Sequence, residues 1–301
     1  MLRWIFLSLG LLAVPIEGQR DFDLEYVEGI EPLSYVAYRT AGALQIDGKL
    51  DEPSWQRAAW TAAFVDIEGQ RKPLPAFKTR VKMLWDDEYL YLAADLEEPH
   101  VWATYTERDA TIYHENDFEV FIDPDGDTHQ YYEFEINALG TEWDLLLVKP
   151  YRDGGPYMSA WDINGLQTAV TVWGSVNNPL DEDQGWSVEM ALPWAVLKEA
   201  TRDKVPPLDG DQWRINFSRV QWAVEYDSGS YIKVEGKGPI CTFQKNGVMC
   251  SSPRPSWADK KSLISPRRRA RPSGFYAGYT IVNADFIRNT GITRRVSTRW
   301  V

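Results

Sequence analysis

Two glutamates in the chain have the spacing of a catalytic carboxylate pair. Glu133 and Glu135 alternate with apolar residues over 132–137, a pattern typical of a β-strand. Residues two apart on a strand face the same side at roughly 7 Å, because side chains alternate between the two faces. Glycoside hydrolases hold their carboxyl groups ~5 Å apart when retaining and ~6.5–9.5 Å apart when inverting. The spacing therefore permits a glycoside hydrolase acting on O-glycosyl bonds, although a solvated polar strand face gives the same pattern.

Aromatic residues gather in a segment between two expected strands. Trp102, Tyr113 and His114 precede the strand-like run 118–122, and loops on a rigid scaffold often carry function. Rings of this kind stack on the C–H faces of sugars, while nearby carboxylates and amides bond to the hydroxyls. The alternative is ordinary packing at the rim of the fold. The candidate carbohydrate-binding residues are Tyr113, His114, Glu119, Glu135, Trp102, Trp143, Arg219 and Trp222.

Arg219 has two competing interpretations. It lies in a strand-like segment over 213–220, and its fork of N–H donors suits sugar hydroxyls. It is equally suited to a structural ion pair with Glu119 or Glu135. The sequence leaves this choice open.

Three aspartates in one turn offer oxygen ligands for a metal. Asp123, Asp125 and Asp127 alternate with Pro and Gly directly after a strand-like run. Such a loop is suited to a structural Ca²⁺, although no glutamate follows at EF-hand spacing. The three histidines are not spaced as zinc ligands. We therefore expect no cofactor, with a structural calcium ion at this turn as the alternative.

The elements that must position these residues are short strands. Residues 81–85 and 89–94 alternate around an Asp-Asp turn and predict a β-hairpin. Short helices are expected at 51–60 and 193–200. Many short strands separated by turns predict an all-β fold, an antiparallel, jelly-roll-like β-sandwich in a single domain with one or two short helices. Further strands are expected at 43–48, 118–122, 132–137, 143–148, 166–173, 186–192 and 213–220.

Composition and the first residues limit the function classes. The net charge of −12 argues against nucleic acid as the partner, because phosphate binding needs an excess of Lys and Arg. Residues 1–18 contain Arg3 and then an apolar run too short to span a bilayer, which is typical of a signal peptide. We therefore expect a secreted or periplasmic protein without a membrane span, with a leader over 19–34 and one domain over 35–240.

Six short motifs occur in order along the predicted domain. Each is weak alone, and together they extend from residue 46 to residue 219. They are Ile46-Asp-Gly-x-x-Asp-Glu-x-x-Trp55, Val81-x-x-Leu-Trp-Asp-Asp-x-Tyr-Leu-Tyr91, Asn116-Asp-x-Glu-Val-Phe-Ile-Asp123, Tyr132-x-Phe-Glu-Ile-Asn137, Gly185-Trp-x-Val-Glu-Met-Ala-Leu-Pro-Trp194 and Trp213-Arg-Ile-Asn-Phe-Ser-Arg219.

This series resembles the family 9 carbohydrate-binding modules of the secreted bacterial type. The resemblance implies a jelly-roll-like sandwich that binds polysaccharide or oligosaccharide beside enzymes that degrade xylan- or cellulose-like glycans, without chemistry of its own. It also implies that structural calcium is an option. Because related sandwiches can hold haem, a haem-binding electron carrier is another alternative, but Met83, Met158 and Met190 offer no clear pair of axial ligands.

The resemblance carries over to the candidate site residue by residue. The best-studied modules clamp a terminal sugar between two tryptophans, and the first of these positions is His114 here, beside Tyr113. The glutamate that bonds to sugar hydroxyls corresponds to Glu119. An arginine that contacts sugar corresponds to Glu135, a reversal of charge. The second clamp tryptophan lies near the C-terminus of the family, where this chain departs from the pattern.

Residues 241–301 differ from the rest of the chain. They contain 12 Lys and Arg but 2 Asp and Glu, against 20 and 42 before them, and they hold both cysteines, Cys241 and Cys250. The family commonly ends in a segment like Asn-Met-His-x-Pro-Glu-x-Trp-Gly-x-Val. The codons permitted for 238–249, read two nucleotides out of frame, allow that ending.

Two hypotheses account for this tail. A frameshift between about Tyr231 and Gly238, natural or from sequencing, would leave a disordered tail and an exposed sheet edge. Alternatively, the tail is a genuine basic extension that binds an acidic surface.

Overall fold

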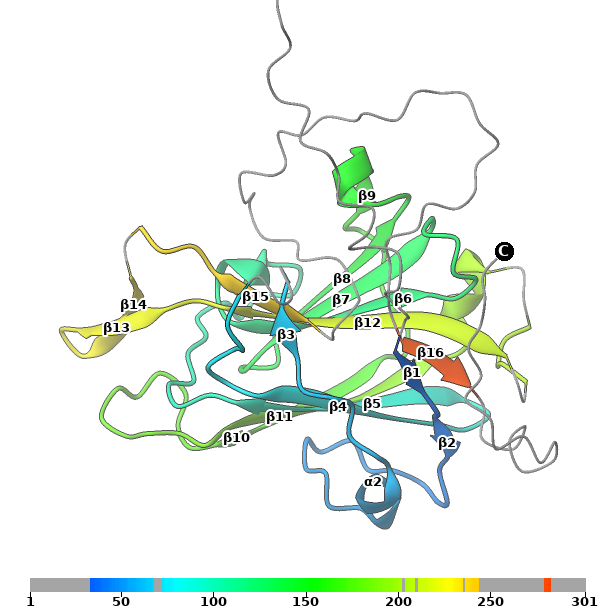
Figure 1. Cartoon of the computed structure of the whole chain (residues 1–301), viewed down its shortest axis with the longest axis horizontal. Coiled ribbons are helices and arrows are strands. Elements are labelled where there is room, and N and C mark those ends of the chain that lie inside the picture. Colours follow the sequence, from blue (N-terminus) through cyan, green and yellow to red (C-terminus); the bar gives the residue numbers. More distant parts are fainter. Residues whose placement is uncertain are drawn as a thin grey trace, which may run out of the picture. The chain divides into compact units, whose positions relative to one another are not determined.

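The protein folds as two β-sheets packed face to face, as a computed structural model shows (Figure 1). The structure describes residues 33–67, 72–201, 204–208, 211–234, 236–243 and 279–282. Within these residues one sheet has nine strands and the other has five, with little helix. The predicted all-β sandwich is therefore confirmed.

The larger sheet carries most of the candidate site residues. Its pairs are antiparallel except for the first pair, which is parallel. Its order is β1 (Ser34–Tyr35), β16 (Tyr279–Val282), β12 (Gln212–Gln221), β6 (Asp117–Asp123), β7 (Tyr131–Asn137), β8 (Glu142–Leu147) and β9 (Tyr157–Met158), and β15 (Ile240–Phe243) joins β12 to β3 (Val65–Asp66).

Strand β15 crosses the domain boundary that the sequence places after residue 240. It pairs with β12 over Ser218–Gln221, so the first residues of the basic tail contribute to the sheet. The boundary and the frameshift stay predictions.

The smaller sheet contains the predicted hairpin. Its order is β10 (Gln167–Trp173), β11 (Gly185–Pro193), β5 (Tyr89–Glu97), β4 (Thr79–Trp85) and β2 (Tyr38–Arg39). Strands β4 and β5 are antiparallel neighbours, which confirms the hairpin. Asp86 closes its turn, since Oδ1 accepts the N–H groups of Glu88 and Tyr89, each at 2.8 Å.

In the part of the chain that the structure describes, helical structure is confined to single turns. The two short helices expected near 51–60 and 193–200 are present, and Pro53 begins the first of them, where its missing N–H costs nothing. A separate hairpin follows β12. The elements are α2 (Pro53–Arg57), the 3₁₀ turns η2 (Ile112–His114), η3 (Tyr151–Asp153) and η4 (Val196–Ala200), and the hairpin β13 (Val224–Asp227) with β14 (Ser230–Lys233).

The main core lies between the two sheets. Alternate residues of β6, Phe118, Val120 and Ile122, pack there against residues of the other sheet such as Val188 and Leu92. Because side chains alternate along a strand, the odd-numbered residues of β6 lie on the outer face of the larger sheet. The fold therefore separates an apolar inner face from an outer face that bears the candidate site.

The strand expected at 43–48 is absent, and this prediction is wrong. The segment is held by a side chain instead of by a ladder: Glu189 Oε2 accepts the N–H groups of Asp47 and Gly48 at 3.0 and 3.1 Å. Glu189 Oε1 also accepts the indole N–H of Trp55 at 2.8 Å. One buried carboxylate thus fastens the loop and helix α2 to β11.

The predicted signal peptide over 1–18 and the leader up to residue 32 lie outside the described residues. Among the residues that the structure describes, no helix is long and apolar enough to cross a membrane.

Candidate functional site

A row of side chains from four neighbouring strands forms the centre of the candidate site. In the sheet register Glu119 on β6 lies opposite Glu135 on β7, which lies opposite Trp143 on β8. On its other side Glu119 lies opposite Ser218 on β12. Directly opposed residues share a face, so two predicted binding glutamates and a predicted stacking tryptophan are brought side by side on the outer face.

Two further carboxylates lie on the same face. Asp117 and Glu133 are each two residues from Glu119 and Glu135 along their strands, and all four side chains are fully buried. Burial raises the pKa of Asp117 and of Glu133 well above the ordinary values, and the nearby Glu119 carboxylate raises both further. Tyr151 donates its O–H to Glu133 Oε2 at 2.6 Å. The face therefore has many hydrogen-bond acceptors and is shielded from solvent.

The turn η2 places aromatic rings against this row. The ring of Tyr113 stacks on Trp143 with centroids 5.9 Å apart, and His114 meets Tyr113 edge-on at 4.5 Å. Tyr113 and His114 are partly exposed, whereas Trp143 is buried. Two of the predicted stacking residues are thus positioned at the rim of the acidic row.

Glu115 holds the segment that leads to η2. Its carboxylate accepts the N–H of Thr104 at 2.6 Å and the side-chain N–H of Asn137 at 2.7 Å. Asn137 is fully buried at the end of β7. The rings of Tyr113 and His114 are therefore tied to the sheet by buried hydrogen bonds.

A second aromatic group adjoins the first. Trp222 donates its indole N–H to the Tyr113 carbonyl at 3.1 Å. The Nζ atom of Lys233 lies 4.1 Å from the Trp222 ring and 5.9 Å from the Trp102 ring, a cation–π arrangement. Trp102 is largely buried. Burial, and secondarily the charge of Lys233, lowers the pKa of His114.

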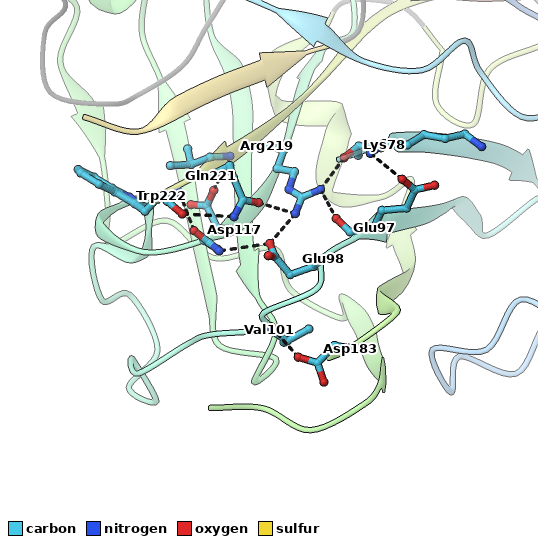
Figure 2. A network of polar contacts seen from close by, with 12 residues as sticks. Lys78, Glu97, Glu98, Val101, Asp117, Asp183, Arg219, Gln221 and Trp222 are labelled. Carbon is cyan, nitrogen blue, oxygen red and sulfur yellow. Dashed lines mark hydrogen bonds and ion pairs between the residues drawn. The ribbon is translucent and has the colours of Figure 1, made fainter. Parts of the chain in front are cut away.

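Arg219 lies apart from this site. Its side chain points between the sheets, where Nη2 meets Glu98 Oε2 at 2.6 Å and Nη1 donates to the Glu97 carbonyl and to Thr79 (Figure 2). The ion pair that the sequence left open, with Glu119 or Glu135, is formed with Glu98 instead. Strand parity gives the reason: Arg219 shares the inward phase of Phe217 and Ile215.

The same network reaches the aromatic group through Asn116. Asn116 donates its side-chain N–H to Glu98 at 3.3 Å and accepts the backbone N–H of Trp222 at 2.7 Å. A chain of buried contacts therefore runs from Arg219 through Glu98 and Asn116 to Trp222.

The acidic turn after β6 brings its three aspartates together. Oxygens of Asp123, Asp125 and Asp127 lie within 4.8 Å of one another. Asp123 already accepts the N–H groups of Gly126 and Thr128, each at 3.0 Å. These bonds close the turn and engage both oxygens of the buried member. Calcium at this turn stays a prediction.

Sequence reasoning missed several residues of the outer face. Asp117, Tyr151, Asn216, Ser218 and Lys233 were not singled out, and Glu133 was considered only as part of a catalytic pair. Strand parity was a usable signal for Asp117, which is in phase with Glu119. The sequence offers no comparable signal for Tyr151 and Lys233, because they reach the outer face from other elements of the fold.

The fold and this face define a β-sandwich binding protein, with acceptors for hydroxyl groups beside flat aromatic rings. The chain belongs to the carbohydrate family 9 binding domain-like family, which matches residues 46–211. The resemblance drawn from the six motifs is therefore confirmed.

Curated relatives share this region. It is 27% identical over 162 residues to an exoglucanase of Acetivibrio thermocellus, and 28% identical over 162 residues to an endo-1,4-beta-xylanase of Thermoanaerobacterium saccharolyticum. Each match covers 54% of this chain but 12% of the relative. The chain thus spans about an eighth of the length of these enzymes.

A solved structure shares the fold. It is a proposed carbohydrate-binding protein of Bacteroides uniformis, 16% identical, with a TM-score of 0.51. The match covers 71% of this chain and 90% of that one.

Proposed function

We propose that this protein binds a polysaccharide or an oligosaccharide on the outer face of β6, β7 and β8. The observation that carries the proposal is the row Glu119–Glu135–Trp143 with the Tyr113 ring stacked on Trp143. Carboxylates accept hydrogen bonds from hydroxyl groups and the rings offer flat apolar surface, the two contacts that a sugar needs. A ligand would first meet Tyr113 and His114, which are partly exposed.

The ligand is a xylan- or cellulose-like glycan, and the protein assists its breakdown. Family membership supports a saccharide as the partner. The names of the relatives, a xylanase and an exoglucanase, support this glycan class.

The chemistry is left to partner enzymes. The family that matches the chain is a family of binding domains. Glu133 and Glu135 are both fully buried, and Tyr151 holds one oxygen of Glu133. This environment supports a structural or binding role for the pair in preference to glycoside hydrolysis.

Affinity gel electrophoresis against soluble xylan and hydroxyethyl cellulose tests the binding. We expect retardation of the full chain, and a loss of at least about tenfold in affinity for Tyr113→Ala and Glu119→Gln, because each removes a central contact. Trp173→Ala is the matched control, since Trp173 is an exposed tryptophan on the other sheet. Equal retardation of all variants would place binding elsewhere, and no retardation on any glycan would contradict the proposal.

Release of reducing sugar from the same glycans tests the absence of chemistry. We expect none from the wild type. Release that Glu133→Gln abolishes would instead identify a glycoside hydrolase.

We also propose that the protein acts in the periplasm or outside the cell. The basic residue and short apolar run at the start of the sequence support export. N-terminal sequencing of the mature protein should find a start near residue 19. A cytosolic product that retains Met1 would contradict export.

A further inference from the structure

The ammonium group of Lys233 lies at the aromatic rim of the proposed saccharide site. Lys233 belongs to β14, in the hairpin that extends beyond the end of the larger sheet (Figure 1). Its Nζ atom lies 4.1 Å from the centroid of the Trp222 ring and 5.9 Å from that of the Trp102 ring. Trp222 is in turn bonded to the carbonyl of Tyr113, whose ring stacks on Trp143. A single indole ring therefore separates the positive charge from the segment that bears the binding rings.

Among the residues that the structure describes, no carboxylate forms an ion pair with Lys233. Burial lowers the pKa of its ammonium group, and the charge of Glu115 opposes that change. Glu115 itself already accepts the N–H of Thr104 at 2.6 Å and the side-chain N–H of Asn137 at 2.7 Å. Aromatic rings compensate a half-buried cation only in part, so an anionic partner would stabilise the ammonium group.

His114 offers a second polar group beside the same rings. Its ring meets Tyr113 edge-on, with centroids 4.5 Å apart, and is partly exposed. Within the described part of the chain its ring nitrogens make no hydrogen bond. The charge of Lys233 reaches this ring, because after burial it is the second cause of the lowered pKa of His114. A neutral imidazole keeps one N–H donor, so the ammonium and the imidazole are both available to a ligand that covers the Tyr113 ring.

We propose that the saccharide site prefers an acidic glycan, one whose sugar units include a uronic acid, and that Lys233 determines this preference. The inference rests on the proposed saccharide binding and names the class of sugar. The carboxylate of the uronic acid accepts charge-assisted hydrogen bonds from the ammonium group of Lys233. The His114 ring supplies a neutral donor to the second oxygen, while the sugar ring covers the flat face of Tyr113.

The acidic row of the outer face does not cancel this preference. Burial raises the pKa of Asp117 and of Glu133 well above the ordinary values, so these carboxyl groups hold their protons to higher pH and carry less negative charge. The carboxylate that affects the pKa of Lys233 is Glu115, whose oxygens are bonded within the protein. At the rim, an acidic sugar therefore meets the charge of Lys233.

Calorimetric titration of the full chain with a matched pair of ligands tests the proposal. One ligand is soluble glucuronoxylan, and the other is the same polysaccharide after chemical reduction of its carboxyl groups to neutral alcohols. We expect the wild type to bind the acidic form at least about fivefold more tightly, since a hydrogen bond to a charged group is stronger than one between neutral groups. Equal or weaker affinity for the acidic form would overturn the preference and leave saccharide binding intact. Binding of neither form would contradict both proposals.

Variants of Lys233 test whether this residue is responsible. In Lys233→Met the ratio of the two affinities should fall to about one, whereas Lys233→Arg keeps the charge and should retain a preference for the acidic form. Each variant is measured on both ligands, so a general loss of affinity cancels from the ratio. Lys78→Met, which replaces an exposed lysine just before β4 of the other sheet, is the matched control and should keep the wild-type ratio. An unchanged ratio in Lys233→Met would overturn the role of Lys233.

A sulfated xylan of the same charge content separates a uronic acid from another anionic group. We expect the wild type to bind it more weakly than glucuronoxylan, because one ammonium group and one neutral N–H donor match the two oxygens of a carboxylate. Equal or tighter binding of the sulfated xylan would overturn the assignment to a uronic acid.

Discussion

Arg219 and Glu98 form a buried ion pair that joins the two sheets. Nη2 of Arg219 lies 2.6 Å from Oε2 of Glu98, and both side chains are 2% exposed (Figure 2). Glu98 lies just beyond β5 of the smaller sheet, and Arg219 belongs to β12 of the larger sheet. Burial raises the pKa of Glu98, and the nearby Arg219 opposes that rise. The pair therefore contributes to stability only while both partners are present.

Replacing Arg219 with Met should destabilise the fold by about 3–5 kcal/mol, because it leaves the Glu98 carboxylate buried and uncompensated. Urea denaturation measures the loss. The double variant Arg219→Met with Glu98→Met should recover most of it, since it removes both charges.

The matched control is the exposed pair of Arg80 and Asp95, with side chains 30% and 37% exposed. Removing this pair with Arg80→Met should lower the free energy of unfolding by less than about 1 kcal/mol. Similar losses at the two pairs would show that burial does not govern the energetics of Arg219.

Stability should depend on pH through Glu189. Burial, only partly offset by its hydrogen bonds with Trp55 and Asp47, raises the pKa of this carboxyl to about 7. Since the folded state holds the proton more tightly than the unfolded chain, the contribution is fully present below the ordinary pKa near 4.5 and is lost as pH rises through 7.

Chemical denaturation measures the free energy of unfolding at each pH. Between pH 4 and pH 8 this free energy should fall by on the order of 1–3 kcal/mol more in the wild type than in Glu189→Gln, because the glutamine cannot ionise. The variant as a whole is expected to be less stable, because Gln cannot accept all three N–H donors. Parallel pH profiles for the two proteins would contradict the role of Glu189.

Gly48 should not tolerate a side chain. Its φ is +81°, and a Cβ would lie 2.8 Å from the backbone nitrogen of Thr171 on β10. We expect Gly48→Ala to cost about 1–3 kcal/mol, from the strained conformation and the backbone clash. Gly42→Ala is the control, because nothing lies within 4 Å of the position that a Cβ would take there. Thermal unfolding of both variants measures the difference. Equal midpoints would show that the loop shifts enough to accommodate the methyl group at position 48.

Lys233 should influence the titration of His114. Burial is the larger cause of the lowered pKa of His114, and the charge of Lys233 is the second. Lys233→Met should therefore raise the pKa of His114 partway to its ordinary value, as measured by NMR of the ring protons. Lys78→Met, which replaces an exposed lysine just before β4 of the other sheet, should leave the pKa of His114 unchanged. An unchanged pKa in Lys233→Met would mean that burial alone sets it.

Much of the fold could be predicted because the alternation of apolar and polar residues along a strand shows which side chains face the core. Alternation along 118–122 and 132–137 separated the core residues from Glu119 and Glu135, and the structure keeps that separation. The hairpin at Asp86 followed from turn composition, which acts over a few residues. The strand expected at 43–48 failed because a distant carboxylate, Glu189, takes its backbone N–H groups.

The class of fold, the family and the face on which each strand residue lies follow from local sequence, because they depend on a period of two and on short motifs. The partners of individual side chains follow from the arrangement of the strands: Arg219 with Glu98, Trp222 with Tyr113, and Asp117 with the Glu119–Glu135 pair. These contacts depend on which strands lie side by side and in what register. That choice is made by packing across the whole sandwich, which no local pattern encodes.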